Sequence, residues 1–270
     1  MFYIGTSGYD YPDWKGIFYP ENLKRQDYLS FYAEQFNGLE LNYSYYTQPT
    51  GAQLSQMVKK TEQKVHFAIK GNKDFTHSTT NWKESVTQFR RELYPLENNG
   101  LLLSVLLQFP QSFHYTPENR QYLHNLIAFF GNTPLCVEFR NREWIRNSVT
   151  EGLRERGCSL CLCDMPSLKN LPSMQEYPKI TQKGASEKTT PLLPLYLRFH
   201  GRNTDNWYTG NQVSRYDYCY SEKELAEWVP FLLEDARENT NRAKNIFFNN
   251  HAQAAAAINA RKLKLLLSKN

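Results

Sequence analysis

A regular alternation of short apolar segments with longer amphipathic segments constrains the fold of this chain more than any other feature. Eight short segments have the length and residue types of β-strands: Phe2–Thr6, Gly38–Asn42, Val65–Lys70, Leu101–Phe109, Leu135–Arg140, Ser159–Asp164, Leu195–His200 and Asn245–Asn249. Strand and helix repeated in this way predict an α/β fold, a (β/α)8 barrel of the TIM type. A doubly wound open sheet is the alternative, because periodicity does not show whether a sheet closes.

Segments with helical periodicity lie between most of these strands. They are Asp27–Phe36, Ala52–Thr61, Trp82–Leu93, Pro117–Phe130, Val149–Arg156, Ser221–Arg237 and Ala252–Leu267. With 270 residues, of which 40% are hydrophobic, the chain has the size of one such barrel. We therefore predict a single domain over residues 1–270. Residues 165–194 contain five prolines and predict an irregular excursion, either a lid or a long loop.

The chain shows no targeting sequence before its first strand-like segment, which predicts a cytoplasmic protein. Its longest apolar run, Leu101–Leu107, is far shorter than the roughly 20 residues that span a bilayer, so we expect no membrane segment. The five cysteines are an odd number and predict mostly free thiols. Cys161 and Cys163 fall on one face of a strand, which favours packing over metal binding. The net charge of +5 permits an anionic partner but is too small to indicate a nucleic-acid-binding face by itself.

The alternation within each strand predicts which side chains point into the barrel. Apolar residues should face the helices, and the polar residues between them should face the interior near the C-terminal ends of the strands. The predicted inward polar residues are Glu40, Asn42, Lys70, Gln108, Glu138, Arg140, Asp164, Arg198, His200 and Asn249. Each buried polar group without a partner would cost roughly 1 to 3 kcal/mol, so these groups must pair with one another or meet a ligand.

Two interpretations of this polar set stay open. Its three acidic side chains balance three basic ones, so the set could be a salt-bridge network that closes the barrel. Alternatively it surrounds a polar ligand, because the active sites of such barrels lie at this end. Glu40 and Glu138 come from opposite sides of the barrel and could converge on one substrate, which suits acid–base chemistry. The two carboxylates could also bind a divalent metal ion, for which His200 is the plausible histidine ligand.

Further candidates lie just beyond the first three strands. Ser7 and Tyr9 belong to the segment Gly5–Tyr9, whose backbone N–H groups could hold an anion, although the segment lacks the lysine of a phosphate-binding P-loop. Tyr9 and Tyr46 are part of an aromatic cluster that either stacks on ligand rings or covers the barrel mouth. His77 follows the third strand, where it either caps a turn or acts at the mouth.

Several segments resemble one known family, in the same order along the chain. They include Gly5–Tyr9, Trp14–Gly16, Glu40–Asn42, Leu107–Pro110, Val137–Arg140, Tyr196–Gly201 and Phe248–Asn250. On these segments the chain is similar to the YecE-like family, a domain of unknown function. The resemblance implies a barrel closely related to the (β/α)8 type and supplies no reaction. Where the family commonly has Arg and often has His, this chain has Thr47 and Asn141, and each difference removes a cationic or acid–base group.

The leading hypothesis is an enzyme of the hydrolase or lyase type that acts on a small polar or anionic substrate at the barrel mouth. The predicted catalytic residues are Glu40, Glu138, His200 and Lys70, and the predicted substrate-binding residues are Ser7, Tyr9, Asn42, Tyr46, His77, Gln108, Arg140, Asp164, Arg198 and Asn249. The chain has no dinucleotide-binding fingerprint, which disfavours a redox enzyme. One alternative is a nucleic-acid-binding or phosphoester-processing protein, and another is a ligand sensor without catalysis. The pattern assigns no oligomeric state.

Overall fold

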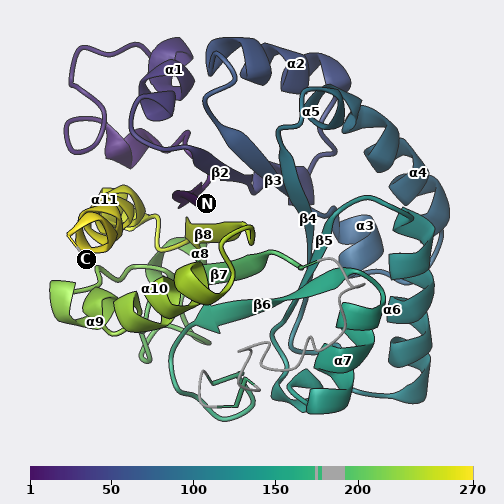
Figure 1. The fold of residues 1–270 in the computed structure, drawn as a ribbon. Helices are drawn as coiled ribbons and strands as arrows, with labels where there is room; N and C mark the ends of the chain where they lie inside the picture. The colour runs from purple at the N-terminus through teal and green to yellow at the C-terminus, as the bar shows by residue number, and fades with distance from the viewer. Residues whose placement is uncertain (174–175, 178–191, 270) are drawn as a thin grey trace.

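The eight predicted strands form a closed parallel barrel in the computed structural model, which describes residues 1–173, 176–177 and 192–269 (Figure 1). The strands are β1 (Phe2–Ser7), β2 (Gly38–Leu41), β3 (His66–Lys70), β4 (Leu102–Phe109), β5 (Leu135–Phe139), β6 (Cys158–Asp164), β7 (Leu195–Phe199) and β8 (Lys244–Phe248). Each strand pairs in parallel with the next, and β8 closes the ring on β1 with Ile246 opposite Ile4. This closure confirms the predicted (β/α)8 barrel and excludes the open sheet.

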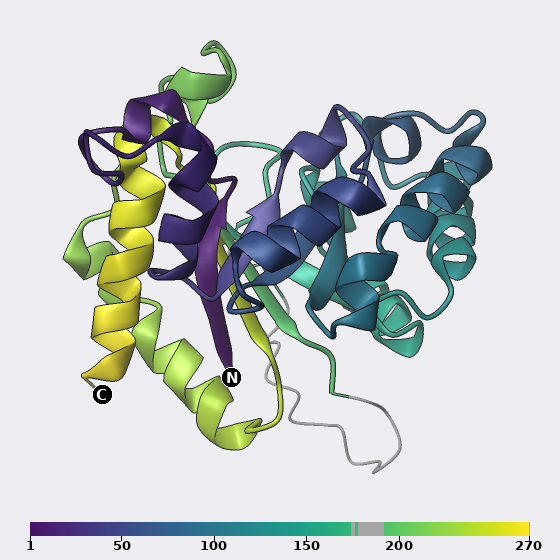
Figure 2. The same cartoon turned by 90° about the horizontal axis from the view of Figure 1, so that it is seen from above.

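The helices lie outside the barrel, and α11, at the C-terminal end of the chain, packs against β1 (Figure 2). They are α1 (Tyr28–Ala33), α2 (Gly51–Lys60), α3 (Lys73–Thr76), α4 (Trp82–Glu92), α5 (Tyr94–Asn98), α6 (Pro117–Phe130), α7 (Asn147–Glu155), α8 (Gln212–Arg215), α9 (Glu222–Ala226), α10 (Val229–Glu238) and α11 (Ala255–Ser268), with short 3-10 turns at Pro12–Trp14, Arg25–Asp27, Tyr43–Tyr45, Arg142–Trp144 and Ala252–Ala254. The helix predicted over Ser221–Arg237 is two helices, α9 and α10. Pro230 has no N–H to bond to the carbonyl of Ala226, so the helix breaks between them.

Apolar side chains form two separate cores, one on each side of the barrel wall. Outward residues such as Leu41, Val137 and Phe199 pack against the helices. A smaller cluster inside the barrel contains Cys136 and Phe247, among other residues. The two cores follow the alternation of each strand, because successive side chains point to opposite faces of the sheet.

The excursion predicted at residues 165–194 falls only partly within the described residues, since 174–175 and 178–191 lie outside them. The part that is described includes Tyr177, whose side chain is buried against the core. No helix in the described part of the chain is long and apolar enough to cross a membrane. All five cysteines are free thiols, as predicted.

The contact between β1 and β2 requires glycine at Gly5, which lies opposite Gly38. Tyr32 is inserted here, with its hydroxyl accepting from the Thr6 N–H at 2.8 Å and donating to the Gly38 carbonyl at 2.9 Å. A Cβ on Gly5 would lie 1.8 Å from the Gly38 carbonyl oxygen and 2.5 Å from the Tyr32 hydroxyl. An alanine side chain therefore has no space between the two strands.

We expect Gly5→Ala to lower the free energy of unfolding by about 3 kcal/mol, because the overpacked side chain must push β1 away from β2. Urea unfolding of the variant and the parent measures this loss. Gly152→Ala in α7 is the control: its nearest neighbour would be Arg156 Nη1 at 3.5 Å, and alanine should leave stability unchanged or raise it by up to about 1 kcal/mol. Equal unfolding midpoints for Gly5→Ala and the parent would contradict the expectation.

Candidate functional site

A cavity of about 620 Å³ opens at the C-terminal ends of the strands. Active sites of (β/α)8 barrels lie at this end, because the loops that follow the strands surround it. Polar and aromatic side chains dominate the wall of this cavity. The residues that line it include Tyr9, Asp10, Tyr11, Asn42, Tyr43, Tyr45, Tyr46, Lys70, His77, Gln108, Arg140, Trp207, Tyr208, Arg215, Tyr216, Asn249 and His251. Eight of the fourteen residues predicted from the sequence are in this set.

Lys70 is the last residue of β3, and its side chain lines the cavity half-buried. Its Nζ lies 4.6 Å from the centre of the Tyr45 ring, and it makes no hydrogen bond or ion pair with any described residue. Burial, followed by the charges of Arg198 and Arg140, lowers the pKa of Lys70 to about 7. A large fraction of Lys70 is therefore an uncharged amine at neutral pH.

Beneath the cavity, Arg198 joins the two carboxylates that the sequence placed on opposite sides of the barrel. Its Nη2 donates to Glu40 Oε1 at 2.6 Å, and its Nη1 donates to Glu138 Oε2 at 2.6 Å. Glu40 also accepts from the Ser7 hydroxyl at 2.5 Å and from the Tyr196 hydroxyl at 2.6 Å. All of these side chains are buried, and none of them lines the cavity. The two glutamates therefore converge on Arg198, as buried ion pairs, and neither of them faces the cavity.

Glu138 also binds the second arginine of this network. Its Oε1 pairs with Arg140 and lies 3.3 Å from His200 Nε2. Burial opposes the ionisation of Glu138, but the charges of Arg140 and Arg198 outweigh burial and hold its pKa well below its usual range. Glu138 is therefore a carboxylate at neutral pH, with both oxygens engaged by cations.

His200 is fully buried next to this pair and carries no charge at neutral pH. Burial, followed by the charge of Arg140, lowers its pKa to about 3. Asn249 Nδ2 lies 3.1 Å from His200 Nδ1, and Asn42 Nδ2 donates to Asn249 Oδ1 at 3.1 Å. An amide N–H toward Nδ1 leaves the ring proton on Nε2, facing Glu138. The chain of bonds from Glu138 through His200 and Asn249 ends at Asn42, which does line the cavity.

The prediction that Asp164 points into the barrel is wrong. Asp164 lies opposite Phe199 in the sheet and, like Phe199, faces outward. Its oxygens accept from Arg202 at 2.9 and 2.7 Å, from the Tyr220 hydroxyl at 2.8 Å and from Trp228 Nε1 at 2.9 Å. Asp164 therefore anchors the segments that follow β7 to the outside of the barrel.

Of the other predicted residues, some line the cavity and one belongs to the buried network beneath it. Tyr9, Tyr46, His77 and Gln108 line the cavity, and Ser7 lies in the buried network below. His77 Nδ1 lies 3.0 Å from the Thr76 hydroxyl, and burial, followed by the charge of Lys70, lowers the pKa of His77 to about 4. His77 is thus a neutral imidazole beside the Lys70 amine.

The two positions that differ from the family pattern lie outside the cavity wall. Thr47 is exposed. Asn141 is buried, where its Oδ1 accepts from the Glu143 N–H at 2.9 Å and its Nδ2 donates to the Gln111 carbonyl at 2.8 Å. Asn141 therefore caps a turn beside the cavity.

Sequence reasoning missed the contribution of the segment after β7. Trp207, Arg215 and Tyr216 from this segment line the cavity, and the Arg140 guanidinium lies 5.6 Å from the Trp207 ring. Arg215 Nε is buried without a hydrogen-bond partner among the described residues. This segment has little periodicity, and its only signal is the density of aromatic residues directly after a strand.

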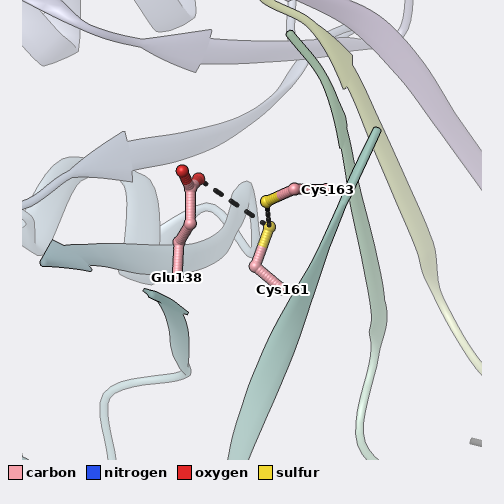
Figure 3. A group of neighbouring side chains, drawn as sticks. All are labelled: Glu138, Cys161 and Cys163. Carbon is pink, nitrogen blue, oxygen red and sulfur yellow. Dashed lines mark hydrogen bonds between the residues drawn. The ribbon is translucent and has the colours of Figure 1, made fainter. Parts of the chain in front are cut away.

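Three side chains inside the barrel are close enough to share a metal ion: Glu138, Cys161 and Cys163 (Figure 3). The two sulfurs lie 3.8 Å apart, and Cys161 Sγ lies 3.9 Å from Glu138 Oε2. Burial raises the pKa of both thiols well above the usual range, and the Glu138 carboxylate is already bound by two arginines. A cation would have to displace these arginines, so the arrangement fits packed thiols better than a metal site.

Comparisons with known proteins place the whole chain in one group. A sequence model described as "Protein of unknown function DUF72" matches residues 3–270. The crystal structure of a DUF72 family protein from Thermotoga maritima MSB8 is similar over 99% of both chains, with 36% identity and a TM-score of 0.86. That of a DUF72 family protein from Enterococcus faecalis V583 is similar over 99% of this chain and 96% of its own, with 24% identity and a TM-score of 0.82. The UPF0759 protein YunF of Bacillus subtilis (strain 168) is 28% identical over 284 residues, which cover 99% of this chain and 95% of YunF.

Proposed function

Because this chain belongs to the DUF72 family of proteins of unknown function, as its sequence motifs indicated, we propose a function from the cavity alone. The barrel mouth binds a small anionic ligand that contains a ring, and Lys70 performs acid–base chemistry on it. The reaction is of the hydrolase or lyase type, and Lys70 takes the acid–base role in place of Glu40 and Glu138.

The charge of the cavity wall is the observation that carries this proposal. Arg140 and Arg215, together with the protonated fraction of Lys70, bring positive charge to the wall. Asp10 is the one acidic residue among the described residues of the wall, and it is paired with Arg25 at 2.8 Å. An anion would therefore gain charge-assisted hydrogen bonds without meeting a free carboxylate. The tyrosines and Trp207 on the same wall offer flat apolar surface to a ring.

Each residue has a role that follows from its position. Lys70 reaches the ligand and can accept a proton, because its pKa of about 7 is close to neutral pH. Arg140 holds the anionic group, and Asn42 orients the ligand through its Oδ1, which is buried without a partner among the described residues. Glu40 and Glu138 act indirectly, because they hold Arg198 and Arg140 in place.

Binding of pyridoxine 5′-phosphate, which contains a ring and a phosphate, tests the proposal. We expect it to bind and to quench part of the tryptophan fluorescence, since Trp207 lines the cavity. Pyridoxine without the phosphate should bind at least about tenfold more weakly, because a charge-assisted hydrogen bond contributes about 1.5 to 3 kcal/mol. Lys70→Met should weaken phosphate-dependent binding by about the same factor. Lys83→Met, on the exposed face of α4, is the control and should bind as the parent does. Equal binding of the two probes would contradict the proposal.

Binding of single-stranded nucleic acid is a second candidate, favoured by the exposed aromatic rim of the cavity. Tyr43, Tyr46 and Tyr208 are 39%, 55% and 53% exposed, and bases stack on such rings. An oligonucleotide whose affinity falls steeply with salt concentration would favour this candidate, since phosphate contacts release counterions. Turnover of a ligand separates the enzyme from a ligand sensor without catalysis.

A further inference from the structure

We infer that the substrate carries an aldehyde or ketone group next to its anionic group, and that Lys70 forms an imine with this carbonyl. This inference rests on the proposed function, because it requires an anionic ligand in the same cavity. It goes further by naming the reacting group of the substrate and the bond that forms.

The surroundings of Lys70 differ from those of Lys244, a buried lysine at the start of β8. Lys244 Nζ donates to the carbonyls of Asn239 at 2.7 Å and Arg242 at 2.9 Å, and it lies 3.4 Å from Asp235 Oδ2. A lysine bound in this way is structural. Lys70 Nζ has the Tyr45 ring on one side and the cavity on another, and none of the described residues forms a hydrogen bond or ion pair with it. Its lone pair is therefore available to a ligand.

The backbone around Lys70 holds its side chain at a defined place on the cavity wall. The Ser44 hydroxyl donates to the Lys70 carbonyl at 2.6 Å, and the next residue, Gly71, donates to the Leu106 carbonyl at 2.8 Å. A nucleophile on a strand is positioned more rigidly than one on a loop. Arg140 on the same wall can bind the anionic group of a ligand whose carbonyl faces Lys70.

The groups around Lys70 lower its pKa, so that part of the lysine is present as the uncharged amine that imine formation needs. Burial, Arg198 and Arg140 lower its pKa, and Glu138 and Glu40 raise it, with a net value of about 7. Desolvation and a neighbouring cation are the usual means of activating a lysine nucleophile. His77, whose pKa is lowered to about 4 by burial and then by the charges of Lys70 and Arg140, and Tyr45, whose ring centre lies 4.6 Å from Nζ, are further titratable groups near the amine.

The step balances without an oxidant or a reductant. The Nζ lone pair adds to the carbonyl carbon, and the C=O π pair moves to oxygen, which takes up a proton. The nitrogen gives up its two protons in exchange, one matching the proton taken up by this oxygen and one going to the hydroxyl group of the carbinolamine, which leaves as water while the C=N bond forms. Amine and carbonyl therefore give imine and one water molecule, and the imine polarises the neighbouring carbon–carbon or carbon–hydrogen bond for lyase chemistry.

Reductive trapping with pyridoxal 5′-phosphate tests the inference, because this reagent adds an aldehyde to the probe used above. The full chain is incubated with the reagent, reduced with borohydride and digested, and the modified peptides are quantified by mass spectrometry. We expect the adduct on Lys70 to exceed the adduct on the exposed Lys73 by at least about tenfold at pH 7, because the lowered pKa of Lys70 leaves a large fraction of its amine uncharged and Arg140 holds the phosphate next to it. The Lys70 adduct should increase with pH around a midpoint near 7.

Two variants and one reagent complete the design. Lys70→Arg keeps a positive charge but cannot form an imine, so it should lose the preferred adduct, and Lys73→Arg should keep it. Pyridoxal without the phosphate should give a weaker Lys70 adduct, because Arg140 has no anion to hold. Adducts spread over the exposed lysines without preference for Lys70, while pyridoxine 5′-phosphate still binds, would overturn the imine and leave the proposed function intact. Failure of both probes would overturn both.

Discussion

Arg198→Met is expected to lower the free energy of unfolding by about 4 kcal/mol, because it leaves two buried carboxylates without their shared cation. Arg198 is 1% exposed and donates to Glu40 and Glu138, each at 2.6 Å. Methionine fills much of the volume of the arginine side chain, so the loss of stability results more from the missing charge than from lost packing. For a chain of this size, the melting temperature should fall by roughly 10 °C.

A double variant separates the charge effect from a simple cavity. Glu40→Gln combined with Arg198→Met removes one charge of each sign and leaves Glu138 paired with Arg140. We expect this double variant to regain a large part of the stability that Arg198→Met loses, because contacting groups are not additive. Lys64→Met, which breaks the exposed pairs with Glu34 and Glu62, should leave the unfolding midpoint close to that of the parent. Urea unfolding of all four proteins measures these differences, and a double variant less stable than Arg198→Met would refute the charge argument.

The second large effect is a loss of stability in mild acid through His200. Its pKa is about 3 in the folded chain and 6.5 in the unfolded chain. Below pH 6.5 the unfolded chain binds a proton that the folded chain does not bind until about pH 3. The contribution of His200 is therefore fully present above pH 6.5 and is lost as the pH falls toward 3. Between pH 6.5 and 4.5 this loss is roughly 2 kcal/mol, because the slope approaches 1.36 kcal/mol per pH unit only once the pH is well below 6.5.

His200→Gln removes the titrating group and keeps a side chain that can hydrogen-bond to Asn249. Glu138 stays ionised through this pH range, because its pKa is held well below its usual value. Arg140 and Arg198, the other charged groups near His200, do not titrate there. We expect the free energy of unfolding to fall less steeply with acid in the variant than in the parent. Parallel curves from pH 6.5 to 4.5 would show that His200 binds its proton equally in both states.

Much of the candidate site followed from strand alternation alone. The period of two residues placed Glu40, Glu138 and Arg198 inside the barrel, because each side chain direction is a local property of a strand. The same rule contained the evidence against Asp164: Cys161 and Cys163 share one face of β6, so the residue next to Cys163 must point the other way.

The sequence by itself determined the barrel and the set of polar side chains in its interior, because both depend on patterns within single strands. Tertiary structure decided which of these groups meet. Glu40 and Glu138 both bind Arg198 and do not line the cavity, whereas Lys70 lines the cavity and has no hydrogen-bond or ion-pair partner among the described residues. Trp207 and Arg215 reach the cavity from a segment without periodicity. These outcomes depend on the register of eight strands around a closed ring and on the paths of the loops over its mouth. Both bring together residues that are far apart in the sequence, so the residue pattern within a single strand or helix does not predict them.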